Sequence, residues 1–361
     1  MNILAFESSC DETSAAVLYA DELCGFEIKS NIVASQIEIH KLYSGVVPEI
    51  ASRAHIEAIS NITYEALSTA NISLSDVDVI AVTASPGLIG ALLVGVNFAK
   101  GLAIANSIPL VAVDHIKGHI ASVYLQEDAP RPPFIALTAS GGHTSIYKVD
   151  SYDEISVIGA TRDDAIGESF DKIGRIIGIP YPAGKGFDKI SERGFERATG
   201  LTIDTPRIYD KYKQSAAYKN ADMYLPSPAL NDGTLDFSFS GLKTASINLL
   251  HKYEQKGEEI DKELFAARYT YEAVEAIAKK ISAALKAYQG YALTISGGVA
   301  ANSHLRRRLA EIAADNGTKI YIPPLSLCGD NAAMIAAAGY YEYKNQKISD
   351  SSLNASALDS I

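Results

Sequence analysis

The sequence has few cysteines and no excess of basic residues. Its three cysteines (Cys10, Cys24 and Cys328) include no CxxC pair, so neither a disulfide framework nor a thiolate zinc site is indicated. Lys and Arg number 32 against 43 Asp and Glu, which leaves a net charge of −11. Because phosphate binding needs a basic face, this balance does not by itself indicate a nucleic-acid partner. A local basic patch or a basic partner subunit could still supply that face.

Segments that enter or cross a membrane are not expected. The opening residues MNILAFE contain no Lys or Arg and reach an acidic residue at Glu7, unlike a signal peptide. The most apolar region, residues 88–105, contains Asn97, Lys100 and several glycines, which favours a buried helix over a membrane span. We therefore expect a cytoplasmic protein without membrane association.

The predicted strand pattern repeats between the two halves of the chain. In each half, two strands flank a turn and a third strand follows. These strands are predicted at 3–6, 13–19 and 26–35, and again at 134–138, 144–149 and 155–160. Since 361 residues are many for one core, we predict an α/β protein of two duplicated lobes, 1–130 and 131–343, with a frayed polar tail at 344–361.

Helices are predicted between and after these strands, and one region shows no periodicity. The predicted helices are residues 48–67, 164–177, 186–199, 242–255, 261–288 and 330–343. Residues 200–235 carry tyrosines and lysines without clear helical spacing. We interpret them as a solvated insertion.

Two histidines follow the predicted strand 108–113. His115 and His119 are four residues apart, a spacing that places both imidazoles on one face of a helix. Two neutral imidazoles can share a divalent metal if a third ligand arrives from elsewhere. The alternative is a surface helix on which two histidines happen to coincide. A zincin-type peptidase is disfavoured, because Ile116 stands where that motif has its general base. His304 has no partner at ligand spacing and is interpreted as structural.

Two glycine turns could hold a nucleotide. The turn at 140–143 (SGGH) lies between strands, and the turn at 296–298 (SGG) lies between a strand and a helix. Paired glycines let the backbone approach a phosphate or a sugar closely. Tight turns without a ligand would give the same pattern. Neither turn matches the P-loop or the dinucleotide-binding fingerprint.

Several carboxylates lie near turns or on predicted helices. Asp330 stands where a loop meets a helix, and from spacing alone an ordinary helix N-cap is the preferred interpretation. Asp164, Glu168 and Asp171 are spaced to share one helix face. A solvated hydrophilic face explains that spacing equally well.

Seven motifs occur in an order that resembles a known family. They are ESSCDET (7–13), GVVPEIASRAH (45–55), HIKGH (115–119), SGGHT (140–144), DDAIGESFDK (163–172), SGGVAAN (296–302) and CGDN (328–331). Together they resemble the bacterial TsaD family (also YgjD or Gcp) of tRNA threonylcarbamoyladenosine transferases. The resemblance spans about residues 1–343. Residue Ala183 stands where the family often has glycine, which affects only the fine geometry beside Gly184.

The resemblance implies a fold, a reaction and its partners. The implied fold is the actin/sugar-kinase-like (ASKHA) fold, with two duplicated lobes around a nucleotide cleft. The implied reaction moves a threonylcarbamoyl group from threonylcarbamoyl-AMP to the exocyclic amine of the adenosine 3′ of the anticodon in ANN-reading tRNAs. Family members work with the partner proteins TsaB and TsaE.

The resemblance also implies which residues form the site. A divalent metal, usually assigned as iron with zinc as the alternative, would be held by His115, His119 and Asp330. The implied substrate-binding residues are Thr138, Ala139, Ser140, Gly141, Gly142, Asp171, Gly184, Asp188 and Asn302. Asp11 is a candidate for accepting the amine proton or orienting the donor, because its turn is expected to face the cleft. The alternatives are an ATP-dependent kinase of the same fold and a nucleotide-binding scaffold without catalysis.

Overall fold

The computed structural model describes residues 1–21 and 25–358, so Cys24 lies outside the described residues. The chain forms two compact units. The first comprises Met1–Pro132, Asp150–Ile155 and Pro323–Ile361, and the second comprises Pro133–Val149 and Ser156–Ile322. This division differs from the lobes expected from the sequence, because the chain returns to the first unit at Pro323. Among the described residues, Cys10 and Cys328 form no disulfide.

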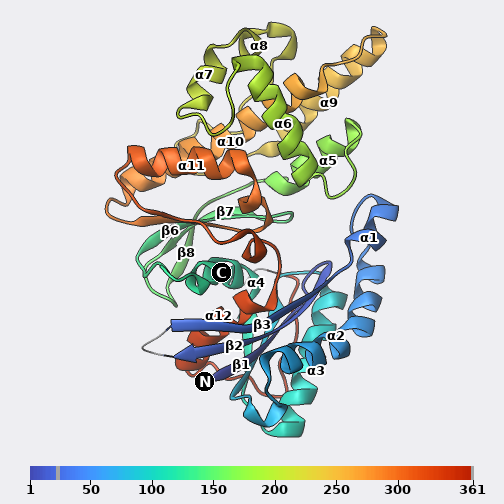
Figure 1. The fold of residues 1–361 in the computed structure, drawn as a ribbon, viewed down its shortest axis with the longest axis vertical. Helices are drawn as coiled ribbons and strands as arrows, with labels where there is room; N and C mark the ends of the chain where they lie inside the picture. Colours follow the sequence, from blue (N-terminus) through green and yellow to red (C-terminus); the bar gives the residue numbers. More distant parts are fainter. Residues whose placement is uncertain (22–24, 359–361) are drawn as a thin grey trace. The chain divides into compact units, whose positions relative to one another are not determined.

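The first unit is built on a mixed five-stranded sheet (Figure 1). The strands lie in the order β3-β2-β1-β4-β5. They are β1 (Asn2–Glu7), β2 (Glu12–Asp21), β3 (Gly25–Ser35), β4 (Val79–Ser85) and β5 (Leu110–Asp114). Strands β1, β2 and β3 pair antiparallel, whereas β4 pairs parallel with both β1 and β5. All seven residues of β4 are buried, as expected of a central parallel strand.

Helices cover both faces of the first sheet. They are α1 (Ile37–His40), α2 (Pro48–Ala70), α3 (Ile89–Asn106), α4 (His115–Ala121) and α12 (Ala332–Lys344). Helix α2 begins with Pro48, whose missing N–H costs no hydrogen bond in the first turn of a helix. It is followed by Asn71, whose backbone adopts the left-handed conformation typical of a helix C-cap. Helices α2 and α3 pack on the face formed by Leu4, Phe6 and Val82. Helix α12 packs on the opposite face, where Gly339 lies against Ala81.

Helix α3 is the apolar segment predicted to be a buried helix. It is long and apolar enough to cross a membrane by length and composition alone. Its Leu92, Val96 and Ala99 are fully buried, and Ser8 lies so close to Gly95 that a Cβ there would sit 2.4 Å from its Oγ. One face of α3 is therefore part of the core of the first unit.

The second unit has a sheet of the same topology. Its strand order is β8-β7-β6-β9-β10, which corresponds to the order in the first unit. The strands are β6 (Phe134–Ala139), β7 (Thr144–Val149), β8 (Ile155–Ala160), β9 (Ala292–Ser296) and β10 (Ile320–Tyr321). β6 pairs antiparallel with β7 and parallel with β9, and β9 pairs parallel with β10. The predicted α/β class and internal duplication are confirmed.

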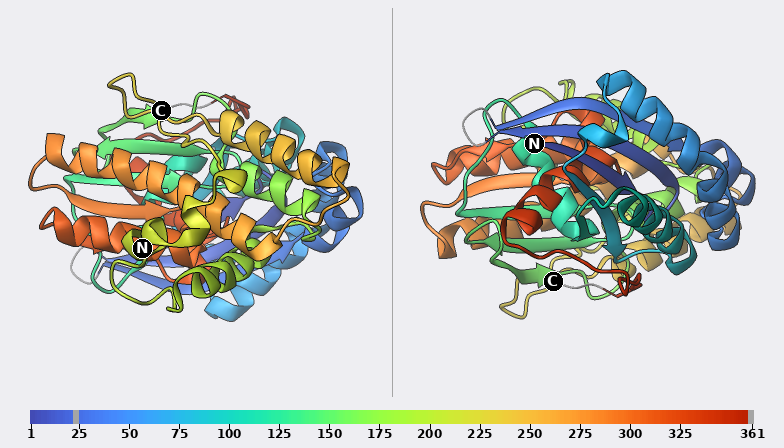
Figure 2. Two further views of the ribbon diagram at one scale, coloured as in Figure 1. Left: turned by 90° about the horizontal axis from the view of Figure 1, so that it is seen from above. Right: turned by 90° about the horizontal axis from the view of Figure 1, so that it is seen from below.

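The helices of the second unit surround the long helix α10, most of whose residues are buried. These helices are α5 (Ile166–Ile176), α6 (Gly184–Thr199), α7 (Ile208–Gln214), α8 (Ala216–Lys219), α9 (Phe239–Gln255), α10 (Lys262–Ala287) and α11 (Ser303–Asp315). Asp261 caps α10 by accepting hydrogen bonds from the N–H groups of Glu263 and Leu264. Figure 2 shows α10 and α11 side by side.

Two segments are more ordered than the sequence predicts. Residues 200–235 contain α7 and α8, and Tyr209 and Tyr212 of α7 are fully buried, so a solvated insertion is the wrong description. The tail beyond α12 also contacts the first sheet, through backbone hydrogen bonds of Ser349 and Ser356, although Leu358 is exposed. The Ser349 N–H donates to the Leu110 carbonyl at the edge of the first sheet, at 2.8 Å. An open sheet edge offers backbone groups to such a segment.

Candidate metal centre

The two histidines lie one turn apart on a buried helix. Strand β5 ends at Asp114, whose carboxylate caps α4 by accepting hydrogen bonds from the N–H groups of Ile116 and Lys117. The rings of His115 and His119 lie 4.6 Å apart, centroid to centroid. Their exposed fractions are 6% and 0%. The alternative of a surface helix is therefore excluded.

Asp330 joins the two histidines from the loop before α12. Asn331 is the N-cap of α12, since its side chain accepts the N–H of Met334. The preferred interpretation of Asp330 as the cap was therefore wrong. Instead, Asp330 Oδ1 lies 3.2 Å from His119 Nε2 and 3.7 Å from His115 Nε2. One ligand atom from each of these three residues lies within 4.8 Å of the other two.

A glycine lets the two ligand-bearing segments approach. Gly118 lies between the histidines in sequence, and a Cβ at this position would sit 2.5 Å from the Cδ1 of Ile335 on α12. A larger residue there would require the Ile335 side chain or one of the two helices to shift. Because Asp330 lies two residues before α12, a shift of α12 would also move its carboxylate relative to the imidazoles. All three candidate ligands belong to the first unit.

The chemistry of these residues fits a metal ion. Within the described chain, neither ring nitrogen of the fully buried His119 makes a hydrogen bond. A buried polar atom without a hydrogen bond is costly, and coordination through Nε2, the nitrogen 3.2 Å from Asp330 Oδ1, would remove that cost at this atom. Two imidazoles and one carboxylate are a donor set used for both iron and zinc.

A buried carboxylate stands behind His115. Glu7 is 1% exposed and its Oε2 lies 3.0 Å from His115 Nδ1. Burial alone would raise the pKa of Glu7, but the charge and hydrogen bond of His115 outweigh burial and lower it. Burial opposes the charged form of His115 as well, yet Glu7 and Asp330 raise its pKa to about 9. The sequence offered no signal for this contact, which joins residues 108 positions apart.

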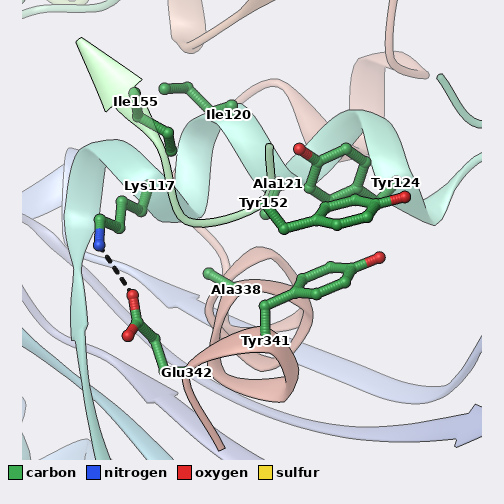
Figure 3. A pocket seen from close by; sticks show the side chains of 9 residues that line it. All are labelled: Lys117, Ile120, Ala121, Tyr124, Tyr152, Ile155, Ala338, Tyr341 and Glu342. Carbon is green, nitrogen blue, oxygen red and sulfur yellow. Dashed lines mark hydrogen bonds and ion pairs between the residues drawn. The ribbon is translucent and has the colours of Figure 1, made fainter. Parts of the chain in front are cut away.

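The other face of α4 packs against aromatic side chains (Figure 3). Tyr152 and Tyr341 stack with their ring centroids 3.9 Å apart, and Tyr124 meets both rings edge-on. Lys117 and Glu342 line the same pocket as an ion pair. Helix α4 is therefore held firmly on the side opposite to its histidines.

Asp11 lies in the turn between β1 and β2, with an exposed fraction of 9%. Its backbone carbonyl accepts the N–H of Gln36 at 3.0 Å. Burial raises the pKa of the neighbouring Glu12 to about 9, and the charges of Asp330 and Asp11 add to that effect. The turn thus concentrates carboxylates within electrostatic reach of Asp330.

The two glycine turns meet in the second unit. Strands β6 and β9 run parallel, so the turns that follow them lie at the same edge of the sheet. Thr138 Oγ1 lies 3.2 Å from Ser296 Oγ. Gly297 has a φ of +88°, and a Cβ there would sit 2.3 Å from the carbonyl oxygen of Ala139. A Cβ on Gly167 would likewise sit 2.5 Å from the Ser140 carbonyl oxygen.

The remaining predicted substrate residues are also in the second unit. Asp171 accepts the N–H of Ala183, the residue before Gly184, at 2.7 Å. Asp188 accepts hydrogen bonds from the Asn302 side chain at 2.8 Å and from the Ser303 N–H at 3.0 Å. Burial raises the pKa of Asp188 to about 6.

The predicted acidic face of α5 is not formed as expected. Asp164 precedes the helix and forms ion pairs with Lys172 and Lys243. Glu168 lies on the helix and is also paired with Lys172, at 2.6 Å. Asp171 instead points to the start of α6, as its hydrogen bond to Ala183 shows.

The chain is similar to one protein family over most of its length. The family model described as TsaD, tRNA N6-adenosine threonylcarbamoyltransferase, matches residues 27–337. Relatives with that same name come from Clostridium botulinum (strain 657 / Type Ba4) and Clostridioides difficile (strain 630). Each is 46% identical, over 355 and 352 residues, and each alignment covers 98% of this chain and 96% of the relative.

Solved structures support the fold. The HypF of T. kodakarensis matches with a TM-score of 0.55 and 12% identity, over 96% of this chain and 48% of that one. Full-length HypF in a phosphate- and nucleotide-bound form matches with a TM-score of 0.50 and 16% identity, over 98% and 47%. At such identities the likeness shows the fold alone. It agrees with the duplicated actin/sugar-kinase-like fold predicted from the sequence.

Proposed function

Because this chain belongs to the TsaD family of tRNA N6-adenosine threonylcarbamoyltransferases, we propose that its donor is threonylcarbamoyl-AMP. The acceptor is the exocyclic amine of the adenosine 3′ of the anticodon in ANN-reading tRNAs. The amine nitrogen bonds to the carbonyl carbon of the threonylcarbamoyl group. The bond from that carbon to the phosphate oxygen breaks, AMP leaves with the bonding pair, and the amine loses a proton to a base.

The observation that carries the metal assignment is the convergence of three ligand atoms within 4.8 Å. In this proposal His115, His119 and Asp330 hold one divalent metal, iron in preference to zinc. A bound metal would supply Lewis-acid polarisation of a phosphate or carbonyl oxygen of the donor. The carboxylate and the imidazoles would fix its place against helix α4.

The second unit would bind the substrate. The residues proposed for this role are Thr138, Ala139, Ser140, Gly141, Gly142, Asp171, Gly184, Asp188 and Asn302. Their support is the meeting of the two glycine turns and the hydrogen bond that joins Asp188 to Asn302. Backbone N–H groups in such turns can stabilise phosphate charge.

Asp11 is proposed to accept the amine proton or to orient the donor. Its support is a position at the turn that also carries Glu12, whose pKa is raised by burial and further by the charges of Asp330 and Asp11. Replacement of Asp11 by Asn should lower the transfer rate while the protein keeps its metal. Full transfer by Asp11→Asn with metal bound would exclude this role.

The proposed partners are the proteins TsaB and TsaE, and the proposed location is the cytoplasm. An acidic chain with a net charge of −11 needs help to hold the tRNA phosphates. A partner that shares the tRNA surface would provide it. A kinase or a scaffold of the same fold is not favoured, because the relatives are named as transferases.

The decisive experiment is reconstitution. Purified protein, candidate TsaB and TsaE, tRNA and synthetic threonylcarbamoyl-AMP are mixed, and the tRNA nucleosides are analysed by mass spectrometry. We expect threonylcarbamoyladenosine with the wild-type chain and a loss of at least about 100-fold with His119→Ala. The exposed Glu258→Gln variant is the control and should behave as wild type. Full activity of metal-stripped protein and of His119→Ala would contradict the metal assignment, and absence of product with every wild-type preparation would contradict the donor.

A further inference from the structure

The buried carboxylate of Glu7 has no part in the chemistry proposed so far. It lies at the end of β1, where pairing with β4 brings it beside Thr83. Glu7 Oε1 accepts the N–H of Ser9 at 2.6 Å, and Oε2 accepts the hydroxyl of Thr83 at 2.5 Å. The same Oε2 lies 3.0 Å from His115 Nδ1. A fully buried carboxylate with three donors around it is strongly held in one orientation.

The partners of Nδ1 determine which nitrogen of His115 is available, and they are Glu7 at 3.0 Å and the Ser9 hydroxyl at 3.2 Å. An ionised carboxylate only accepts hydrogen bonds, so Nδ1 carries its proton wherever it faces ionised Glu7. The opposite nitrogen, Nε2, is the one that lies toward Asp330, at 3.7 Å. His119 differs, because its ring nitrogens make no hydrogen bond within the part of the chain that the structure describes. The two histidines are therefore not equivalent.

We propose that Glu7 is a positioning residue that holds His115 in the Nδ1–H form and directs Nε2 to the metal. Resting on the metal site proposed above, this inference adds a residue that does not itself touch the ion. A carboxylate behind a ligating imidazole orients the ring and makes it a stronger donor, and its loss lowers metal affinity by about 10–100-fold. Glu7 would thus set the affinity of the centre through His115.

The test measures Co²⁺ affinity of the purified full chain, using the visible absorption of the bound ion and competition with a chromophoric chelator. Glu7→Gln preserves the side-chain shape and removes the charge, and we expect its dissociation constant to rise about 10–100-fold. Glu258→Gln is the matched control, because it makes the same substitution at an exposed position in the second unit, away from Glu7 and His115. We expect less than about a threefold change for it. Unfolding temperatures of the metal-free proteins check that each variant is folded.

The His115→Ala variant distinguishes failure of the positioning role of Glu7 from failure of the metal site itself. If it abolishes Co²⁺ binding while Glu7→Gln binds as tightly as wild type, the role of Glu7 is overturned and the metal site stands. If His115→Ala binds Co²⁺ as wild type does, the metal site itself is wrong. Should Glu7→Gln not fold, histidine ¹⁵N NMR of the Zn²⁺-loaded wild-type chain decides. Zinc on Nε2 of His115 with a proton on Nδ1 supports the proposal, and zinc on Nδ1 contradicts it.

Discussion

Lys117 Nζ lies 2.8 Å from Glu342 Oε1, and this ion pair joins the helix that carries both histidines to the helix that follows Asp330. The Glu342 side chain is 9% exposed and also pairs with Lys347, at 2.9 Å. These two contacts lower the pKa of Glu342 although burial opposes them. The pair therefore restrains α4 against α12 from the face that lacks the histidines.

We expect Lys117→Met to lower the metal affinity of the centre. Loss of a half-buried ion pair costs about 1 kcal/mol, which corresponds to roughly a fivefold weaker affinity if the whole loss falls on ligand alignment. Removal of the positive charge of Lys117 would by itself strengthen cation binding. A weaker Co²⁺ affinity would therefore show that the candidate ligands have lost their alignment. Co²⁺ titration of the purified chain provides the measurement.

Lys347→Met is the matched control for this prediction. Lys347 pairs with the same carboxylate but lies after α12, not on α4. It should therefore change stability without changing Co²⁺ affinity. Equal affinities for Lys117→Met and Lys347→Met would show that the pair plays no part in aligning the ligands.

Gly297→Ala should disrupt the meeting of the two glycine turns. The φ of +88° is unfavourable for alanine, and the added Cβ would collide with the carbonyl oxygen of Ala139. We expect a loss of about 2 kcal/mol or more in unfolding free energy and a lower transfer rate. The neighbouring Gly298 has no described atom within 4 Å of its added Cβ, so Gly298→Ala should stay within about 0.5 kcal/mol of wild type. Denaturant unfolding compares the two, and equal losses would refute the steric argument.

Acid should destabilise the second unit through His304. Burial lowers the pKa of His304 from 6.5 to about 3, so the folded chain keeps it neutral while the unfolded chain protonates it. The contribution of neutral His304 to the free energy of unfolding is complete above pH 6.5. It is lost as the pH falls toward 3. Between pH 6.5 and pH 4 the loss amounts to about 3 kcal/mol.

His304→Phe removes this titration and should flatten the dependence of unfolding free energy on pH by about that amount. The comparison uses only the slopes of unfolding free energy against pH. The absolute values are not compared, because the larger phenylalanine ring also alters packing with Phe195 and Tyr209. Parallel pH profiles for wild type and variant would contradict the prediction.

Local patterns in the sequence predicted much of the fold, and the residues explain why. The β-branched run before Asp114 and the spacing of His115 and His119 identify a strand and a helix without any knowledge of the rest of the chain. The duplication was visible because each half repeats strand, turn and strand. Such patterns act over a few residues, so they do not require tertiary contacts.

The rest depends on contacts between distant segments. The position of Asp330 in the first unit follows from the packing of α12 on the first sheet, which the order of the motifs does not reveal. The contact of Glu7 with His115 joins the ends of two strands that are far apart in sequence. Family resemblance supplied the candidate ligand set, whereas spacing alone favoured a helix cap for Asp330.

Tyr212 shows the same limit, because its burial depends on a partner outside the segment. Its ring stacks on Phe195 of α6 with centroids 4.2 Å apart, whereas Tyr224 nearby is 67% exposed. Tyr212→Ala should lower the unfolding free energy by about 3–5 kcal/mol, and Tyr224→Ala by no more than about 1 kcal/mol.

The hydroxyl of Tyr212 supplies a sharper prediction. It is buried and makes no hydrogen bond with any described residue, so it contributes a desolvation cost without compensation. Tyr212→Phe keeps the stacked ring and removes that cost, and it should leave stability unchanged or raise it by up to about 1 kcal/mol. Thermal unfolding of Tyr212→Ala and Tyr212→Phe separates the contribution of the ring to stability from that of the hydroxyl. If Tyr212→Phe were as unstable as Tyr212→Ala, the hydroxyl would have a partner and the packing argument for residues 200–235 would fail.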